Sequence, residues 1–377
     1  MEIIQKNSYW DVDLMKDNII SHSKPYIDIN DVEAVKQTVE LEYLSTNKIV
    51  NKFENKISDY IDRSFSRTVN SGSSALQIAL RALNVGKNDE VIIPTYTCPS
   101  LLNSIYEIQA KPIVCDINKD NLNISYKEVQ NKITSKTKTI ILPHTFGNII
   151  NIRKFYSFNI PIIEDFTQAF GATYEGSMIG SFGDISICSF GSTKMITMGQ
   201  GGILLTDSEK NIKEIERLLD YDFNPQEVKY SNFARFNYNI TDFQAAMGLS
   251  QFKKTSYFLK KRKDIARKYN RILRQKGMDV LPIYEKNRSV YYRYLFKVNK
   301  EKRSKYLKKF EKNNIQVISS GTHLLHRYIK NYTDNQFPNA VDIFNEVISI
   351  PIYPALTKNE INYIYKNLES IIMECKS

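Results

Sequence analysis

Between residues 53 and 206, short β-rich runs alternate with helical patterns along the chain. Several of these runs are apolar almost throughout, as expected for strands that are covered on both faces. Helical stripes of apolar residues lie between them, for example at 74–83 and 99–108. The alternation predicts an α/β chain whose main sheet is mostly parallel and carries helices on its faces. The predicted strands are 90–94, 112–116, 139–143, 160–165, 184–190 and 202–206.

The character of the chain changes after an alanine-rich helical segment at 243–249. Long, charged helical stretches with fewer strands follow, and a chain of 377 residues exceeds a single typical domain. We therefore expect an N-terminal arm or helix at 1–40, a large α/β domain at 41–250 and a smaller C-terminal α+β domain at 251–377.

The charge balance limits the kinds of partner that the chain suits. It has 52 Lys and Arg against 41 Asp and Glu, a formal net charge of +11. Such a balance suits an anionic substrate, a nucleic acid or a membrane surface. The lysines are spread over helical stretches, as is typical of solvated helix faces, so we expect no nucleic-acid binding. No segment approaches the ~20 apolar residues of a membrane span, so we expect no membrane association.

The four cysteines, Cys98, Cys115, Cys188 and Cys375, lie far apart and form no CxxC pair. This spacing indicates neither a zinc site nor a disulfide framework. Charged residues interrupt the first 18 residues, which argues against a signal peptide. We therefore expect a cytoplasmic protein without a bound metal.

A turn of small residues, Asn70-Ser71-Gly72-Ser73-Ser74, leads directly into a predicted helix. A helix N-terminus presents free N–H groups, and a glycine there lets a phosphate approach closely. Serines at a helix start are equally typical of N-caps. The turn alone is therefore compatible with a phosphate site or with simple capping.

Asp165 ends one apolar strand, and Lys194 follows another. In open α/β sheets, ligands bind at the carboxyl ends of the strands. A carboxylate there can keep a pyridinium nitrogen protonated, and a lysine can form a Schiff base when its pKa is lowered. A helix-capping acid and a solvated lysine are the alternatives. The polar segment 235–242 before the alanine-rich helix is likewise typical of capping.

Taken in order, these segments resemble the DegT/DnrJ/EryC1/StrS aminotransferases, the sugar aminotransferases of fold type I that use pyridoxal 5'-phosphate (PLP). The resemblance runs from Lys24-Pro25-Tyr26 to Ser349-Ile350-Pro351-Ile352-Tyr353-Pro354 and so spans nearly the whole chain. It implies a large domain with a mostly parallel sheet, a smaller C-terminal α+β domain, and PLP as the cofactor.

The resemblance also implies a role for individual residues. Lys194 would carry the Schiff base to the cofactor and then move protons. Asp165 would pair with the pyridine nitrogen, and Gln168 would contact the hydroxyl side of the ring. Asn237 would reach the cofactor phosphate across a homodimer interface, so that one active site needs two chains. The residues that would hold the phosphate within one chain are Gly72, Ser73, Ser74 and Ser189.

The implied reaction has two halves: an amino acid, usually L-glutamate, aminates the cofactor, and the aminated cofactor then aminates a ketone. We expect the ketone of a nucleotide-linked keto-deoxysugar, for surface-polysaccharide or related sugar biosynthesis. The alternatives are the same reaction on a small phosphorylated ketone such as dihydroxyacetone phosphate, a PLP-dependent sugar dehydratase, and a non-catalytic PLP- or sugar-binding regulator. Dehydratases of the family replace the lysine with histidine, so Lys194 argues against the dehydratase.

The chain departs from the family pattern at several positions near the expected site. Gly191 stands where the family usually has histidine. Cys98 stands where an aromatic residue commonly stacks on the cofactor, and Tyr96 is a candidate substitute. Arg235 replaces a frequent glycine, and we expect its guanidinium to bind a substrate phosphate. His326 aligns with a histidine near the sugar pocket, so we expect it to contact substrate.

Overall fold

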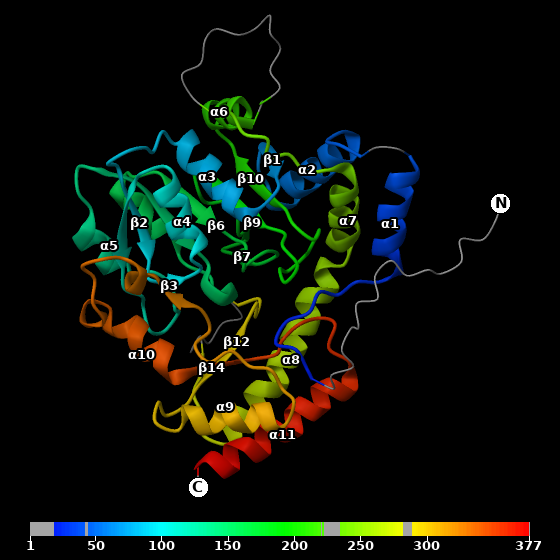
Figure 1. Ribbon diagram of the computed structural model, residues 1–377, viewed down its shortest axis with the longest axis vertical. Coiled ribbons are helices and arrows are strands. Elements are labelled where there is room, and N and C mark those ends of the chain that lie inside the picture. The colour runs from blue at the N-terminus through cyan, green and yellow to red at the C-terminus, as the bar shows by residue number, and fades with distance from the viewer. Residues whose placement is uncertain (1–18, 42–43, 220, 222–233, 282–288, 377) are drawn as a thin grey trace, which may run out of the picture.

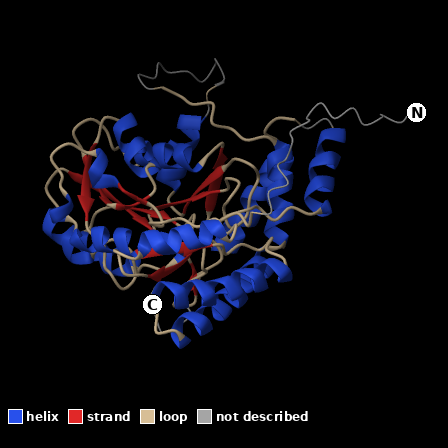
Figure 2. Cartoon of the chain, turned by 60° about the horizontal axis from the view of Figure 1, so that its bottom comes forward, coloured by secondary structure: helices blue, strands red, loops and turns tan. Residues whose placement is uncertain are grey.

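The computed structural model describes residues 19–41, 44–219, 221, 234–281 and 289–376 (Figure 1). Within these ranges, a large sheet lies between helices, and long helices of the C-terminal part pack together at one end of the molecule (Figure 2). None of the helices described is both long enough and apolar enough to cross a membrane.

The main sheet of the described residues has seven strands: β1 (Phe65–Val69), β2 (Glu90–Pro94), β4 (Lys111–Cys115), β5 (Thr137–Pro143), β6 (Ile162–Asp165), β9 (Ile185–Ser189) and β10 (Gly202–Thr206). Their order is β1-β10-β9-β6-β5-β2-β4. β10 is antiparallel to both of its neighbours, and the other strand pairs are parallel. The predicted mostly parallel sheet is confirmed.

All six predicted strands are present, and 90–94 and 202–206 have the predicted bounds. β6 begins after Pro161, which has no N–H to donate to a neighbouring strand. Strand β1 was not predicted from the sequence, because its centre is the polar run Ser66-Arg67-Thr68. The structure stabilises this run through the buried Glu54, whose carboxylate accepts hydrogen bonds from the Thr68 N–H and hydroxyl.

Helices cover both faces of the main sheet, because successive strand side chains point to opposite faces. Ile92 belongs to one apolar core, whereas its neighbours Val91 and Ile93 belong to the other. Helices α3 (Gly72–Ala82), α4 (Ser100–Glu107) and α6 (Glu209–Leu219) pack on the Val91 side. Helices α2 (Lys48–Ile61), α5 (Tyr126–Lys132) and α7 (Asp242–Lys253) pack on the Ile92 side. The predicted helices at 74–83, 99–108 and 243–249 correspond to α3, α4 and α7.

Short elements complete the connections between these strands and helices. They are the strand pair β7 (Thr173–Tyr174) and β8 (Ser177–Met178), and the 3-10 helices η1 (Thr145–Gly147), η2 (Ile152–Phe158), η3 (Leu325–Tyr328) and η4 (Asp334–Gln336).

The N-terminal segment is anchored by polar contacts to helix α7. Helix α1 (Ile29–Glu40) starts with a capping box between Asp28 and Asp31 and lies beside α7. Gln251 and Lys254 donate hydrogen bonds to the buried Asp31 carboxylate. Asp242, at the start of α7, accepts bonds from N–H groups at the start of α2. The carboxylates therefore fix the positions of α1 and α2 relative to α7.

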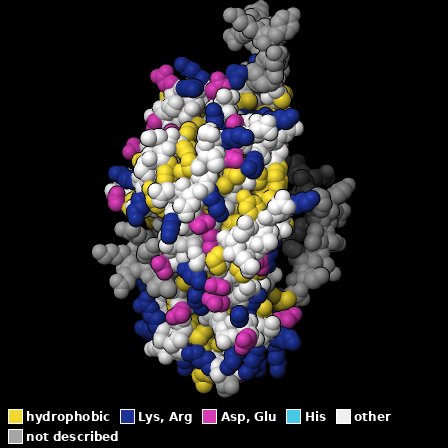
Figure 3. Space-filling model, turned by 90° about the vertical axis from the view of Figure 1, so that its left-hand side faces the viewer, with side chains coloured by type: hydrophobic (Ala, Val, Ile, Leu, Met, Phe, Trp, Pro, Cys, Tyr) yellow, Lys and Arg dark blue, Asp and Glu magenta, His cyan; other side chains and the backbone are white. Residues whose placement is uncertain are grey.

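The C-terminal part builds a third apolar core on a three-stranded antiparallel sheet. Its strands are β11 (Val280–Leu281), β12 (Tyr294–Lys297) and β14 (Val347–Ile350), and its helices are α8 (Thr255–Gln275), α9 (Arg303–Lys312) and α11 (Lys358–Lys376). Lys and Arg side chains gather over the end of the molecule that α9 and α11 form (Figure 3). α7 and α8 meet at Lys254, within the predicted boundary region, but the division into domains stays a prediction.

One strand pair connects the C-terminal part to the main sheet. β3 (Tyr96–Thr97) follows the carboxyl end of β2, and it pairs with β13 (His323–Leu324). Helix α10 (Pro338–Glu346) contributes Ala340 and Ile343 to the core on the α3 side of the sheet. The C-terminal part is thereby held against the carboxyl edge of the parallel strands.

Candidate active site

A cavity of about 670 Å³ lies between the carboxyl edge of the main sheet and the C-terminal part. Cys98, Gln168 and Lys194 line it from the main-sheet side, and Arg293 and Arg327 line it from the other. Its described lining contains three cations and no Asp or Glu. The cavity therefore favours an anionic ligand.

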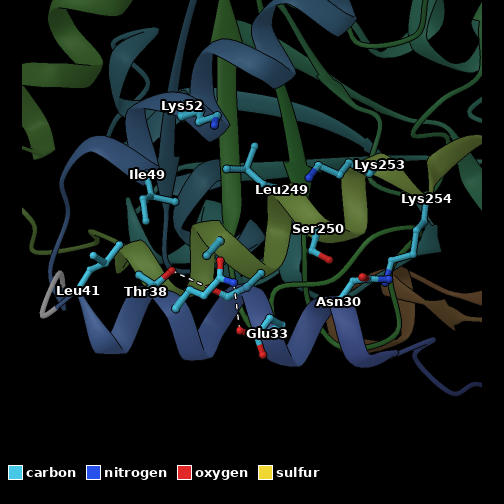
Figure 4. A pocket seen from close by; sticks show the side chains of 13 residues that line it. Asn30, Glu33, Thr38, Leu41, Ile49, Lys52, Leu249, Ser250, Lys253 and Lys254 are labelled. Carbon is cyan, nitrogen blue, oxygen red and sulfur yellow. Dashed lines mark hydrogen bonds between the residues drawn. The ribbon is translucent and has the colours of Figure 1, made fainter.

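A second groove, of about 590 Å³, lies between α1, α2 and α7 (Figure 4). Glu33, Ile49, Lys52 and Lys253 are among the residues around it. None of the predicted site residues lines this groove. We therefore place the candidate active site in the cavity that contains Lys194.

Lys194 lies in the turn between β9 and β10, and its backbone N–H donates to the Gly191 carbonyl over 3.1 Å. Its Nζ lies 5.8 Å from the centre of the Tyr292 ring. Burial opposes the lysine charge, but the nearby Tyr292 and Asp165 outweigh it and raise the Lys194 pKa above its ordinary value. In this state the lysine is an ammonium ion; a reacting amine requires that a bound ligand lowers its pKa.

Asp165 ends β6, the strand beside β9, so its carboxylate lies on the same edge of the sheet as Lys194. Its Oδ1 accepts the Thr167 N–H over 3.0 Å. Burial raises the pKa of Asp165, against the opposing effects of Thr167 and Lys194. An acid in this position becomes a stable anion when a protonated ring nitrogen lies against it.

The residue before Asp165 holds this edge of the sheet in place. Glu164 is fully buried and accepts hydrogen bonds from the N–H groups of Gly180, Phe182 and Gly183. His144 Nε2 lies 3.1 Å from Glu164 Oε1, while its Nδ1 accepts the Ile150 N–H. The hydrogen bonds from His144 and from the backbone N–H groups lower the pKa of Glu164 despite its burial.

Gly72 and Ser189 form a cradle where the first turn of α3 meets the end of β9. A Cβ added at Gly72 would lie 2.6 Å from the Ser189 Cβ, so only glycine permits this approach. The first N–H groups of a helix have no intrahelical partner and bind phosphate well. The cradle, the Lys194 amine and the Asp165 carboxylate therefore fit the phosphate, the aldehyde and the ring nitrogen of PLP.

Ser74 lies in the predicted turn and is hydrogen-bonded within it. Its hydroxyl donates to Asn70 Oδ1 over 2.6 Å, and its N–H donates to the Ser71 hydroxyl. Ser74 is buried, whereas Ser73 is exposed at the start of the helix. The polar groups of Ser74 thus stabilise the turn, and the predicted phosphate contacts of Gly72, Ser73, Ser74 and Ser189 stay predictions.

Gln168 lines the cavity and is held by an unusual turn. Its Oε1 accepts the Phe146 N–H over 2.6 Å, and Phe146 has a φ of 58°. Since the oxygen of the amide is engaged, its NH2 group is the part that can donate to a ligand oxygen. This arrangement suits the predicted contact of Gln168 with the ring hydroxyl, which stays a prediction.

The structure does not bring Arg235 and Asn237 to the cavity of their own chain. Both lie in the segment before α7, where the Asn70 N–H donates to the Tyr238 carbonyl. Asn237 is exposed. The predicted contact of Asn237 across a dimer interface, and that of Arg235 with a substrate phosphate, therefore stay predictions.

His326 and Tyr96 are buried and lie outside the described lining of the cavity. The ring nitrogens of His326 lie within hydrogen-bond distance of Thr95 and Asp334. The Tyr96 hydroxyl donates to the Ser320 carbonyl. The expected substrate contact of His326, and the replacement of the stacking residue by Tyr96, stay predictions.

Phe146, Tyr292 and Arg293 line the cavity, and the sequence analysis missed them. Phe146 follows β5, and Tyr292-Arg293 precede β12, so each comes from a segment remote from the motifs that were singled out. One local signal was present: Arg293 interrupts a run of tyrosines, Tyr291-Tyr292-Arg293-Tyr294.

Comparisons with known proteins show what this chain is similar to. An uncharacterized protein of Methanocaldococcus jannaschii is 31% identical over 386 residues, covering 96% of this chain and 100% of that protein. GDP-perosamine synthase of Escherichia coli O157:H7 is 27% identical, covering 92% of this chain and 96% of the synthase. The solved structure of a Helicobacter pylori aminotransferase involved in pseudoaminic acid biosynthesis matches with a TM-score of 0.87 at 20% identity, covering 94% and 100% of the two chains.

The fold and the site define a PLP-dependent aminotransferase of fold type I, as predicted. Residues 25–369 match the model of the DegT/DnrJ/EryC1/StrS aminotransferase family. The chain belongs to this family, which confirms the resemblance seen in its sequence.

Proposed function

We propose that this protein transfers the amino group of an amino acid, L-glutamate in the first instance, to the ketone of a nucleotide-linked deoxysugar. The observation that carries the proposal is that Lys194, which lines the cation-rich cavity, lies at the same carboxyl edge of the sheet as Asp165 and the Gly72–Ser189 cradle. A sugar product of this kind serves surface-polysaccharide or related sugar biosynthesis.

PLP, when bound, supplies an electron sink that makes the hydrogen on the α-carbon of an amino acid acidic. Lys194 Nζ is the base that takes this proton and returns it one position away, because it is the amine that lines the cavity. Asp165 keeps a proton on the ring nitrogen, and its burial strengthens that pairing. The Tyr292 ring lies 5.8 Å from Lys194 Nζ, and it comes from the C-terminal part of the chain.

The substrate class is supported by the charge of the cavity and by relatives. Nucleotide-linked sugars carry two phosphates, and the lining has cations without acids. A GDP-perosamine synthase covers nearly the whole chain at 27% identity. A Cβ added at Gly191 would lie 3.9 Å from Lys194 Cε, so the missing family histidine leaves space beside the reacting amine.

We also propose that the active form is a cytoplasmic homodimer with sites at the subunit interface. Asn237 is exposed and does not line the cavity that contains Lys194. Helix α1 presents an exposed apolar stripe, with 72% exposure at Ile29, 53% at Val32 and 49% at Val39. A stripe of this kind on an outer helix is typical of a protein interface.

The test of the proposed function is an absorbance spectrum of the purified protein with PLP, followed by L-glutamate. We expect the visible band of the lysine-bound cofactor to form and then to vanish with glutamate, and Lys194→Ala to form no such band. The aminated enzyme is then given a nucleotide-linked keto-deoxysugar or dihydroxyacetone phosphate, and return of the band identifies the acceptor. A protein that forms no band with PLP would refute the proposal.

A further inference from the structure

The cavity holds one cation whose charge no described side chain balances. Of the three cations in the lining, Arg327 donates through Nε and Nη2 to the Asp334 carboxylate over 2.9 and 2.7 Å. Lys194 lies beside Asp165. Arg293 has no ion pair with any described residue, and its buried Nη1 has no hydrogen-bond partner in the described part of the chain.

Arg293 is held close to the reacting end of the cavity. It directly follows Tyr292, whose ring lies 5.8 Å from Lys194 Nζ. Its Cζ lies 6.0 Å from the centre of the Phe146 ring, and Phe146 in turn orients Gln168. The guanidinium is therefore supported by an aromatic face on the same side of the cavity as the predicted ring contact.

An unpaired buried guanidinium nitrogen costs free energy unless a ligand accepts its hydrogen bonds. The planar donors of arginine match a carboxylate in a two-point arrangement. In an α-amino acid, the carboxylate and the reacting nitrogen share one carbon, so a cation near Lys194 suits that carboxylate. The phosphates of a nucleotide-linked sugar are separated from its ketone by the sugar ring and suit the outer part of the cavity.

We propose that Arg293 binds the α-carboxylate of the amino donor and thereby orients it toward Lys194. This inference rests on the proposed function and adds to it a donor-specificity residue that lies outside the predicted motifs. Arg327, already paired with Asp334, lies at the outer part of the cavity and does not share this task.

The test compares the wild type with Arg293→Gln, Arg293→Lys and a remote control, Arg267→Gln. Arg267 is an exposed arginine of α8 that pairs with Asp264. Each protein is loaded with PLP, and the rate of the first half-reaction is followed at rising L-glutamate concentration. We expect Arg293→Gln to load PLP normally while its apparent Kd for glutamate rises roughly 10- to 100-fold, the loss expected for a charge-assisted bond. The apparent Kd of Arg293→Lys should lie between those of the wild type and Arg293→Gln, because lysine keeps the positive charge but lacks the planar pair of donors.

A second measurement needs no turnover. Binding of glutarate, a dicarboxylate that lacks the amino group, is measured by calorimetry on the PLP-loaded proteins. We expect a similar weakening in Arg293→Gln and no change in Arg267→Gln, and thermal unfolding of every variant shows whether each is folded. Unchanged glutamate and glutarate affinities in folded Arg293 variants would overturn the assignment.

The half-reaction with the acceptor shows whether Arg293 binds the carboxylate of the donor or a phosphate of the nucleotide-linked sugar. If Arg293→Gln weakens the nucleotide-linked sugar and leaves glutamate unaffected, the arginine binds a phosphate and the proposal is wrong as stated. If the wild-type protein binds no PLP, both the proposed function and the role of Arg293 are refuted. If the wild type and Arg293→Gln both react normally with glutamate, the proposal for Arg293 is wrong and the proposed function stands.

Discussion

Replacing Gly72 with alanine should damage the cofactor cradle while leaving the rest of the fold intact. The new methyl group would lie 2.6 Å from the Ser189 Cβ and 3.1 Å from its Oγ, so the start of α3 and the end of β9 must separate. Overpacking of this kind costs roughly 1–3 kcal/mol. Replacing glycine with alanine at a helix start offsets part of this loss of stability, by at most about 1 kcal/mol. We therefore expect the free energy of unfolding to fall by about 1–2 kcal/mol.

The effect on PLP should be larger than the effect on stability. Separating Ser189 from the α3 N-terminus weakens the hydrogen bonds to the phosphate, and each charge-assisted bond contributes roughly 1.5–3 kcal/mol. We expect the Kd for PLP to rise at least about tenfold. Fluorescence titration with PLP and urea unfolding measure the two effects separately.

Gly86 provides the matched control, because an added Cβ there meets no atom within 4 Å. Gly86→Ala should keep both the stability and the PLP affinity of the wild type. The double variant Gly72→Ala with Ser189→Gly removes the steric contact and the hydroxyl, so stability should recover while PLP affinity stays low. If Gly72→Ala binds PLP as tightly as Gly86→Ala does, the cradle is not the phosphate site and the reasoning is refuted.

Three further predictions address the ring contact, the interface and the N-terminal arm. Asp165→Asn keeps the side-chain shape but not the charge, so PLP should still load while the single-turnover rate of the glutamate half-reaction falls roughly 100-fold; an unchanged rate would exclude the ring-nitrogen role. Mixing inactive Lys194→Ala with inactive Asn237→Ala should restore up to roughly a quarter of the activity if the interface is shared, since half of the dimers then carry one complete site; no recovery after confirmed subunit exchange would contradict the shared site. Burial, with Arg293 and Arg262, lowers the pKa of His22 to about 3. In the unfolded chain His22 takes up a proton below pH 6.5, so the stability is complete above that pH and falls toward pH 3, by up to roughly 5 kcal/mol. Urea unfolding across this window should be less pH-dependent in His22→Gln, and an equal slope would show that other groups cause the loss.

The parts of the fold and site that could be predicted from the sequence are those encoded by contiguous residues. The apolar runs that became β2 and β10 carry their own signal, and so do Asp165 and Lys194, because each follows such a run directly. Strand β1 could not be recognised in this way, since its polar centre is stabilised by Glu54 on another element. The buried position of His326 could not be predicted either, because its hydrogen-bond partner Thr95 lies 231 residues away in the chain.

The topology of the sheet explains why the candidate reacting groups could be predicted from the sequence and the opposite wall of the cavity could not. Parallel strands deliver their carboxyl ends to one edge, so any polar residue directly after an apolar strand is brought to the site by local sequence alone. The opposite wall exists only because β13 pairs with β3 and sets the C-terminal part over that edge. Arg293 therefore becomes a cavity residue through a pairing that involves other segments, and its unbalanced charge is visible only in the folded chain. The residues proposed for the reaction accordingly lie at strand ends, whereas Arg293, the residue proposed to bind the donor, reaches the cavity through long-range pairing.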